Sequence, residues 1–249
     1  MSYNACFDLI KHASIVTVLT GAGVSTLSGI PDFKGKNGVF HSNWQGFPVQ
    51  HLLDITFFKQ QPEVFYRYAA ECLYPMLEKA PSIAHQTLAA LQKKRVVDTI
   101  YTQNIDCLHG KAGAEDVVEL HGSMRGHLCT HCGKSFALPL VLDKISGGMA
   151  PRCDECTALI KPDVVFYGET LNEKRLSRAF HDFAKSAVII VMGSSLTVPP
   201  VSTLPMQTRI GGGKIIIVNE QETVYDQHAA WRFPDIEEFC QMLSRYMDA

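Results

Sequence analysis

Four cysteines have the spacing of a metal site. They form two CxxC pairs separated by 20 residues: Cys129, Cys132, Cys153 and Cys156. Each pair places two thiolates on one tight turn, and two such turns complete a tetrahedral sulfur site for one zinc ion per chain. Because four protein ligands leave no coordination position open, we expect the zinc to be structural. A redox role is the alternative for one CxxC, but thioredoxin-like motifs do not occur as two spaced pairs.

A glycine-rich turn follows the first apolar run and reads GAGVS from Gly21 to Ser25. Glycines after a strand allow the backbone to approach a phosphate closely, and the helix start that follows offers free N–H groups. The turn differs from the dinucleotide fingerprint of dehydrogenases: Thr26 stands at the third glycine position, and no acidic residue closes a strand about 20 residues on. A strand-to-helix turn without a ligand is the alternative interpretation.

Polar side chains follow two other apolar runs at the point where each run ends. Gln103, Asn104 and Asp106 come after residues 96–102, and His121 ends the run 117–121. Parallel sheets bind ligands beyond the carboxyl ends of their strands, so these groups are predicted to meet at one edge. Histidine suits a general base, whereas Asn and Asp can hydrogen-bond a carboxamide or orient a water molecule. Alternatively, each residue simply caps a helix or a loop.

The elements that position these groups follow from the hydrophobic pattern. Five short runs rich in β-branched residues are apolar on both faces, as in a buried parallel sheet: residues 15–20, 96–102, 117–121, 187–193 and 214–219. Helical periodicity occurs at residues 83–91, 176–183 and 236–247, with Asp235 as the cap of the last helix. Strands that alternate with helices predict an α/β fold with a Rossmann-like parallel sheet.

Two stretches interrupt this pattern. Residues 41–80 are aromatic and helical and contain no strand candidate, which predicts an inserted helical module. Residues 126–158 contain the four paired cysteines together with Gly147, Gly148 and Pro151, which predicts a small zinc-ribbon module. The remaining segments, 1–40, 81–125 and 159–249, are assigned to the Rossmann-like sheet domain.

Composition restricts the class of protein. The 249 residues are 46% hydrophobic and 19% charged, an ordinary globular mixture that argues against extended disorder. The formal net charge of −2, without any basic block, disfavours direct nucleic-acid binding. The longest unbroken apolar run, residues 187–192, is too short for a membrane span, and no signal peptide is visible. We therefore predict a cytoplasmic protein with no membrane or nucleic-acid partner.

The cysteine count fits that location. Eight cysteines in a long chain without an export signal are better explained as reduced thiols, half of which hold metal, than as disulfides. His127 and His131 are the alternative ligands in the metal segment. The other four cysteines are expected to be packing residues: Cys6, Cys72, Cys107 and Cys240.

Seven motifs occur in a specific order and spacing. They are GAGVSTLSGIPDF at 21–33, TQNID at 102–106, HG at 121–122, the four cysteines, KPDVVFYGE at 161–169, GSSL at 193–196 and VN at 218–219. On these motifs the chain resembles a sirtuin, an NAD-dependent protein deacylase, over nearly its whole length. The pattern is most similar to the undifferentiated bacterial and archaeal members. The resemblance implies NAD as co-substrate and acylated-lysine proteins or peptides as partners.

The resemblance also implies a role for each matching residue. Contacts with phosphates and ribose are implied for Ala22, Thr26, Ser194 and Ser195, and a place near the adenosine for Asn219, Asp235 and Ile236. The nicotinamide pocket would consist of Phe33, Ile105 and Asp106, while Gln103 and Asn104 would hold the nicotinamide ribose and a water molecule. The acyl-lysine peptide would add as a strand between Val165, Phe166, Gly168 and Glu169 on one side and Val198 on the other.

The implied reaction is acyl transfer to ADP-ribose. The acyl oxygen attacks the ribose carbon as nicotinamide leaves, and His121 then acts as general base on a ribose hydroxyl, with Asn104 beside it. Lys34 stands where the family usually has arginine; lysine keeps the charge but loses the bidentate fork, so a looser hold on NAD is expected. The alternatives are a protein ADP-ribosyltransferase on the same scaffold and a non-enzymatic binding module, which would have no use for such a base.

The helical module contains the expected determinant of acyl preference. In family members that remove acidic acyl groups, a tyrosine and an arginine three residues later bind the distal carboxylate. Tyr66 matches the tyrosine, but Ala69 stands at the arginine position, and Arg67 points about 200° away on a helix. The small Ala69 is expected to leave an apolar channel for acetyl or longer unbranched acyl groups, because an unpaired buried carboxylate is costly.

Overall fold

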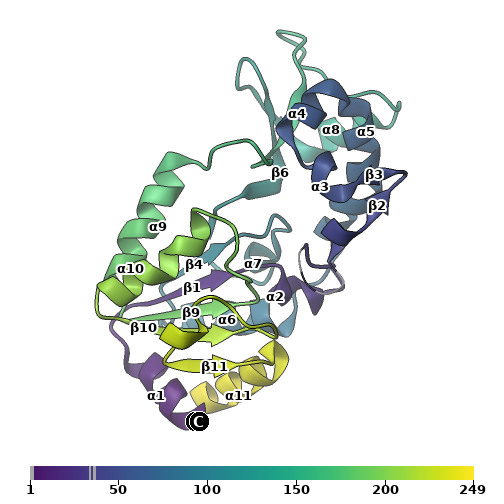
Figure 1. Cartoon of the computed structure of the whole chain (residues 1–249). Helices are drawn as coiled ribbons and strands as arrows, with labels where there is room; N and C mark the ends of the chain where they lie inside the picture. Colours follow the sequence, from purple (N-terminus) through teal and green to yellow (C-terminus); the bar gives the residue numbers. More distant parts are fainter. Residues whose placement is uncertain (1–2, 34, 36–37) are drawn as a thin grey trace.

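A parallel sheet forms the middle of the larger, lower part of the molecule in the computed structural model, which describes residues 3–33, 35 and 38–249 (Figure 1). Within these residues six strands lie in the order β11-β10-β9-β1-β4-β5. They are β1 (Val16–Thr20), β4 (Thr99–Thr102), β5 (Val117–Glu119), β9 (Val188–Met192), β10 (Lys214–Val218) and β11 (Trp231–Phe233). The five predicted strands are confirmed with shorter ends. The sequence pattern does not indicate β11, because this edge strand has three residues and only Phe233 is buried.

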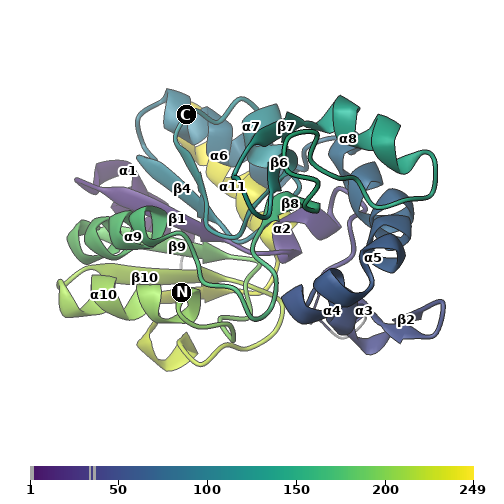
Figure 2. The same ribbon diagram turned by 90° about the horizontal axis from the view of Figure 1, so that it is seen from above.

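Helices cover both faces of this sheet (Figure 2). One face packs against α1 (Tyr3–His12), α6 (Ile83–Lys93) and α11 (Ile236–Asp248), and the other against α9 (Glu173–Lys185) and α10 (Leu204–Ile210). Successive strand residues enter opposite layers: Val18 belongs to the first hydrophobic cluster and Leu19 to the second, and both are fully buried. The predicted Rossmann-like parallel α/β fold is thus confirmed, and burial on both faces explains the continuous apolar runs.

Side-chain caps begin several of these helices. Asp235 accepts the Glu238 N–H at 2.9 Å, which confirms the predicted cap of α11, and Asn172 accepts the Arg175 N–H at 3.1 Å. Such caps satisfy backbone donors that the first helical turn leaves free, and each typically contributes about 1 kcal/mol. The predicted helices at 83–91, 176–183 and 236–247 correspond to α6, α9 and α11.

Residues 41–80 form a mainly helical insert, as predicted. Its helical elements are α3 (Val49–Leu52), α4 (Ile55–Gln60), α5 (Pro62–Tyr68), a π-helical turn (Ala69–Leu73) and a 3₁₀ helix (Tyr74–Glu78), preceded by a 3₁₀ turn (Val39–His41). The expectation of no strand is wrong, because β2 (Asn43–Trp44) and β3 (Phe47–Pro48) form a small hairpin. Gln45 and Gly46 have φ values of 47° and 87°, as a type I′ turn requires, and strands of two residues are too short to show periodicity.

A three-stranded antiparallel sheet in the order β7-β6-β8 contains the first paired cysteine, Cys129. Its strands are β6 (Gly122–Cys129), β7 (Ser135–Ala137) and β8 (Ile160–Val164), and α8 (Leu138–Ile145) follows β7. The ribbon and the helical insert share one hydrophobic cluster, in which Phe65 and Tyr66 are buried together with Phe136 and Val141. We therefore propose that residues 41–80 and 126–158 act as one small domain beside the sheet domain of residues 1–40, 81–125 and 159–249.

The remaining short helices are α2 (Gly23–Thr26), α7 (Leu108–Lys111) and two 3₁₀ turns (Val201–Thr203 and Asp226–His228). In the part of the chain that the structure describes, no helix is long and apolar enough to cross a membrane. Cys6 and Cys240 are fully buried as predicted, and Cys107 is half-buried. Cys72 is exposed, contrary to prediction, because the π-helical turn buries only Ala69 and Leu73.

Candidate active site

A large cavity lies at the carboxyl edge of the parallel sheet. Its volume is about 1030 Å³. The segments that follow β1, β4, β9 and β10 line it from the sheet, and Phe40, Leu53 and residues 164–171 line it from other sides. The predicted convergence of polar strand ends is therefore present in three dimensions.

Most of the predicted site residues line this cavity. They are Ala22, Thr26, Phe33, Gln103, Asn104, Ile105, His121, Val165, Phe166, Gly168, Glu169, Ser194, Ser195, Val198, Asn219 and Ile236. Asp106 and Asp235 are not among the described lining residues. Asp106 is only 4% exposed, and Asp235 is exposed and caps α11. The predicted residue Lys34 lies outside the residues that the structure describes.

Two glycines allow the turns after β1 and β9 to touch. A Cβ atom on Gly21 would lie 2.6 Å from the carbonyl oxygen of Gly193, and a Cβ on Gly193 would lie 2.6 Å from the nitrogen of Val24. Gly193 also has a φ of +64°, in the left-handed region that favours glycine. Any side chain at either position would push the two strand ends apart.

The glycine-rich turn offers fewer free N–H groups than the sequence predicts. Gly23 N–H donates to the Gly193 carbonyl at 2.9 Å, Val24 N–H to Gly21 at 3.2 Å and Ser25 N–H to Ala22 at 3.0 Å. Two of these donors bond within the turn, because α2 is a single turn of four residues, and the Gly23 N–H bonds to the neighbouring strand end at Gly193. Among the described residues, the Ala22 N–H has no partner and is available to an anion.

Asn104 is fixed beneath this turn by hydrogen bonds. Its Nδ2 donates to the Gly21 carbonyl and to Ser25 Oγ, both at 3.0 Å. Ser25 Oγ in turn donates to Asp106 Oδ2 at 2.6 Å, and the Leu108 N–H donates to Asp106 Oδ1 at 2.9 Å. Asp106 therefore lies behind Ser25 and braces it. The amide oxygen of Asn104 has no partner among the described residues, so it is the group that a ligand can engage.

Gln103 links the ends of β4 and β9 across β1. Its Nε2 donates to Ser194 Oγ at 2.7 Å, and Ser194 Oγ also accepts the Leu196 N–H at 3.3 Å. β1 lies between these two strands in the sheet, so the bond passes over the position of Gly21, which has no side chain to block it. The hydroxyl of Ser195 pairs with that of Thr197 at 3.0 Å.

His121 is oriented by the backbone of Gln103. Its Nδ1 lies 2.9 Å from the Gln103 carbonyl oxygen, which can only accept, so Nδ1 is protonated and Nε2 is the unprotonated nitrogen of the neutral ring. Burial lowers the pKa of His121 below its usual value, and the hydrogen bond to Gln103 partly opposes this shift. The imidazole is therefore neutral at pH 7, with Nε2 able to take a proton.

Aromatic rings form an apolar side of the cavity. The ring of Phe40 lies between those of Phe33 and Tyr167, with centroid separations of 5.2 and 5.8 Å. Phe40, Leu53 and Tyr167 line the cavity but are not among the predicted residues. Phe40 lies at the start of an apolar, aromatic-rich stretch and Leu53 lies inside it, so composition does not distinguish these lining residues from core residues. Tyr167 is different, because it lies inside the motif at 161–169 that indicated its neighbours.

Two further polar residues at the end of β10, one acidic and one amide, line the cavity but were not predicted. Glu220 and Gln221 directly follow Asn219. The signal that indicated Gln103 and His121, a polar residue after an apolar strand, applies equally to this strand end.

Two buried histidines support the site from behind. His85 and His109 are 0% and 2% exposed, and their ring centroids are 4.6 Å apart. His109 Nε2 lies 2.9 Å from Thr20 Oγ1 at the end of β1, and His85 Nδ1 lies 2.8 Å from Ser82 Oγ. Burial lowers the pKa of His85 to about 4, against an opposing effect of Asp106. Both rings are thus neutral packing groups.

The segment expected to select the acyl group lies outside the cavity lining. The Tyr66 hydroxyl donates to the Ile160 carbonyl at 2.5 Å, and Ala69 is fully buried. Neither residue is among the described ones that line the cavity, so the channel beside Ala69 stays a prediction. Arg67 is exposed, which confirms that it faces away. Phe33, Phe40 and Leu53 supply the apolar surface instead.

The four paired cysteines converge in the small domain. Their Sγ atoms all lie within 4.8 Å of one another, and two of the separations are 3.3 and 3.7 Å. Tetrahedral Zn–S bonds of about 2.3 Å require separations of about 3.8 Å. Backbone N–H groups of His131 and Cys132 approach Cys129 Sγ at 3.5 Å, whereas His127 Nε2 is bonded to the Tyr74 hydroxyl. The residues therefore fit one structural zinc held by cysteine alone.

Comparisons with known proteins agree with this architecture. A family model described as the Sir2 family matches residues 21–200. The NAD-dependent protein deacetylase of Thermotoga maritima is 40% identical over 242 residues, which are 97% of this chain and 96% of that protein. The NAD-dependent protein deacylase 1 of Archaeoglobus fulgidus is 38% identical over 86% of this chain and 84% of that protein.

Solved structures show the same similarity. A Sir2 complex with a p53 peptide and NAD⁺ matches with a TM-score of 0.91 and 38% identity, over 100% of this chain and 99% of that one. Sir2Tm bound to a propionylated peptide matches with a TM-score of 0.90 at 38% identity, with the same coverage. The chain belongs to the Sir2 family.

Loss of one zinc ligand is expected to unfold the ribbon. Cys153→Ala removes one of four thiolates, and because metal binding is coupled to folding, the zinc content should fall from one per chain and the Tm by more than about 10 °C. The matched control is Cys72→Ala, which replaces an exposed cysteine outside the cluster and should change neither quantity. Metal analysis and thermal melting measure both. A metal-free protein with an unchanged Tm would contradict the assignment.

Proposed function

We infer that this chain is an NAD-dependent protein lysine deacetylase. It transfers the acyl group from lysine to ADP-ribose and releases nicotinamide and O-acetyl-ADP-ribose. The observation that carries this inference is His121, a neutral imidazole with a free Nε2 on the same cavity as Asn104 and the glycine-rich turn. Supporting it, a relative named NAD-dependent protein deacetylase is 40% identical over 97% of this chain.

The cavity suits NAD in size and in chemistry. Its volume of about 1030 Å³ lies at the upper end of ligand pockets, which leaves room for a dinucleotide and an acyl-lysine side chain. We assign the phosphates to the Ala22 N–H and the Ser194 hydroxyl, and to Thr26 once its hydroxyl gives up the 2.9 Å bond to the Gly23 carbonyl. We assign the nicotinamide to the side of Phe33 and Ile105. NAD supplies an electrophilic ribose carbon with nicotinamide as its leaving group. The apolar rings would exclude water, which would otherwise hydrolyse NAD.

His121 supplies the proton acceptor in this proposal. The Gln103 carbonyl holds the Nδ1–H, so Nε2 is presented to a ribose hydroxyl and takes its proton. The ring then becomes an imidazolium, and its bond to the carbonyl strengthens because the donor is now charged. Asn104 uses both amide hydrogens on Gly21 and Ser25, so its oxygen is left to orient the ribose or a water molecule.

The partner we propose is an acyl-lysine peptide bound through its backbone. Val165, Phe166, Gly168 and Glu169 line the cavity together with Val198, so an extended peptide can add as a strand between these segments. Recognition through main-chain groups is largely independent of the peptide sequence. We also propose a cytoplasmic location without a nucleic-acid partner, supported by the net charge of −2.

Product analysis tests the reaction. Mass spectrometry of the protein with NAD and an acetyl-lysine peptide should show the deacetylated peptide, nicotinamide and O-acetyl-ADP-ribose in equal amounts. A peptide or protein that gains the mass of ADP-ribose would favour ADP-ribosyl transfer instead. Nicotinamide release that does not depend on the acylated peptide would contradict the proposal.

Replacing the base should separate two steps of the reaction. His121→Ala is expected to slow product formation about 10²- to 10⁴-fold, the usual contribution of a general base. Nicotinamide departs before the base is needed, so exchange of labelled nicotinamide should be affected much less. Equal loss of both activities would show that His121 mainly shapes the NAD site.

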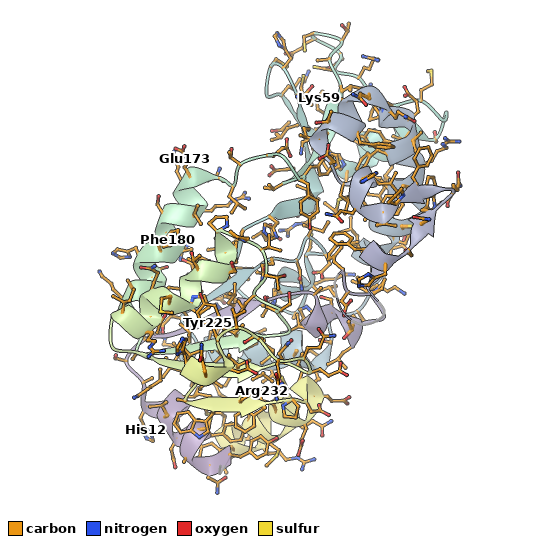
Figure 3. All side chains as sticks on the ribbon, viewed as in Figure 1. His12, Lys59, Glu173, Phe180, Tyr225 and Arg232 are labelled. Atoms are coloured by element: carbon orange, nitrogen blue, oxygen red, sulfur yellow. The ribbon has the colours of Figure 1, made fainter. Side chains whose placement is uncertain are left out.

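The acidic limb of the pH profile should report the lowered pKa of His121. The imidazole must be neutral to accept a proton, so activity is present above its pKa and is lost as the pH falls through it. Because burial lowers this pKa below 6.5, the acidic midpoint of kcat/KM should also lie below 6.5. The control is His12→Gln on α1, which should leave this midpoint unchanged. His12 lies at one end of the molecule, and Lys59 of the helical insert marks the other (Figure 3). A midpoint above 6.5 would contradict the assignment.

Acetyl-lysine should be a much better substrate than succinyl-lysine. No lysine or arginine is among the described residues that line the cavity, whereas Asp32, Glu169, Glu173 and Glu220 are. Against these described residues a distal carboxylate would be buried without a cation, and kcat/KM should be lower by at least about 10²-fold. Measurements on two acyl forms of one peptide decide this. The control Arg67→Ala should leave the ratio unchanged, and comparable rates for the two forms would show that a cation reaches the pocket.

A further inference from the structure

Lys161 on β8 makes a closely packed set of contacts outside the cavity lining. Its ammonium group lies 3.0 Å from Glu169 Oε2, 2.5 Å from the Val164 carbonyl oxygen and 3.2 Å from that of Pro162. The same nitrogen is 4.2 Å from the centroid of the Phe166 ring. Three acceptors thus match the three protons of the ammonium group, and the side chain is only 13% exposed.

The carboxylate that Lys161 holds also closes a turn in the predicted peptide-binding segment. Glu169 Oε2 accepts the Phe166 N–H at 2.8 Å, and the Glu169 N–H donates to the Phe166 carbonyl at 3.0 Å. Gly168, inside this turn, has a φ of +87°, and a Cβ there would lie 3.0 Å from Ile55 Cγ2. The turn is therefore held in one conformation from both ends.

Most backbone groups around this turn already have partners. Val165 N–H donates to the His121 carbonyl at 2.8 Å, Tyr167 N–H to Leu53 at 2.9 Å, and Ile55 N–H to the Tyr167 carbonyl at 3.0 Å. Among the described residues, the Val165 carbonyl and the Gly168 N–H have no partner, and both residues line the cavity. These two groups are the ones that an added strand can use.

We propose that Lys161 is a positioning residue for the acyl-lysine peptide. Through Glu169 it keeps the Phe166 N–H occupied, and it thereby leaves the Val165 carbonyl and the Gly168 N–H as the pairing groups. The inference rests on the proposed function, because it names how that site sets the register of its peptide. Without Lys161 the carboxylate turns to water, and the Phe166 N–H becomes a competing donor for the incoming strand.

The Lys161 ammonium group and the Glu169 carboxylate form an ion pair, so a double variant that removes both charges can be compared with the two single variants. Burial lowers the pKa of Lys161, and Glu169 opposes that shift, so the carboxylate compensates the partly buried ammonium group. Removal of one partner leaves the other buried and unpaired, whereas removal of both does not. The single variants Lys161→Met and Glu169→Gln should therefore each raise the peptide KM at least as much as the double variant does.

The experiment compares peptide and NAD binding in these variants. Lys161→Met is expected to raise the KM for an acetyl-lysine peptide about 10-fold or more, the effect of losing one charge-assisted hydrogen bond, while the Kd for NAD changes less than about 2-fold. The matched control is Lys134→Met. Lys134 also pairs with carboxylates, at 2.9 Å from Asp154 and Glu155, and lies 5.6 Å from the Phe136 ring, but it is outside the cavity lining. This control should change neither quantity.

A scan with backbone N-methylated peptides reads the register directly. In the wild-type protein, methylation should weaken peptide binding strongly only at the one peptide N–H that meets the Val165 carbonyl. In Lys161→Met, the loss of affinity should be similar at neighbouring positions. A folded Lys161→Met protein with unchanged peptide KM, or with peptide and NAD binding weakened equally, would overturn the inference. A peptide that binds in register without turnover would contradict the proposed function alone, and failure of the wild-type protein to bind any acetyl-lysine peptide would overturn both.

Discussion

The contact between the ends of β1 and β9 is the constraint on which the site depends. Gly21 and Gly193 approach so closely that neither has room for a Cβ atom. This approach lets Gln103 reach over β1 to Ser194, and it places the carbonyl of Gly21 where Asn104 can donate to it. The polar groups of three neighbouring strands are thus locked to one another before any ligand binds, which reduces the reorganisation that binding requires.

The same framework extends to the zinc site through two antiparallel strands. β6 begins at Gly122, directly after His121, and reaches the cysteine cluster at Cys129. β8 pairs with it in the register Gly122 to Val164, and the Val165 N–H then donates to the His121 carbonyl. A structural ion at one end of the ribbon therefore stabilises the pairing that positions the base and the peptide-binding segment at the other end.

The described residues of the cavity offer few positive groups to an anionic dinucleotide, and the predicted cation Lys34 lies outside them. The described lining contains carboxylates but no lysine or arginine, so the phosphates would depend on backbone N–H groups and hydroxyls. Buried histidines do not supply positive charge, because burial lowers the pKa values of His121, His85 and His109. In the proposed reaction the neutral His121 accepts a proton, and the aromatic rings that line the cavity exclude water.

The sequence by itself determined the parallel sheet, the zinc ligands and the polar strand ends, because these depend on short-range patterns: runs apolar on both faces, CxxC spacing, and polar residues directly after a strand. It did not reveal β2, β3 or β11, whose two or three residues are too few for a period. Only the tertiary structure decided that Asp106 braces Ser25 behind the cavity, that Tyr66 is committed to Ile160, and that Lys161 fixes Glu169. The first two pairs are distant in the chain, and the third is brought together by a turn. No short-range sequence pattern predicts such contacts, because they depend on which groups the fold leaves unpaired.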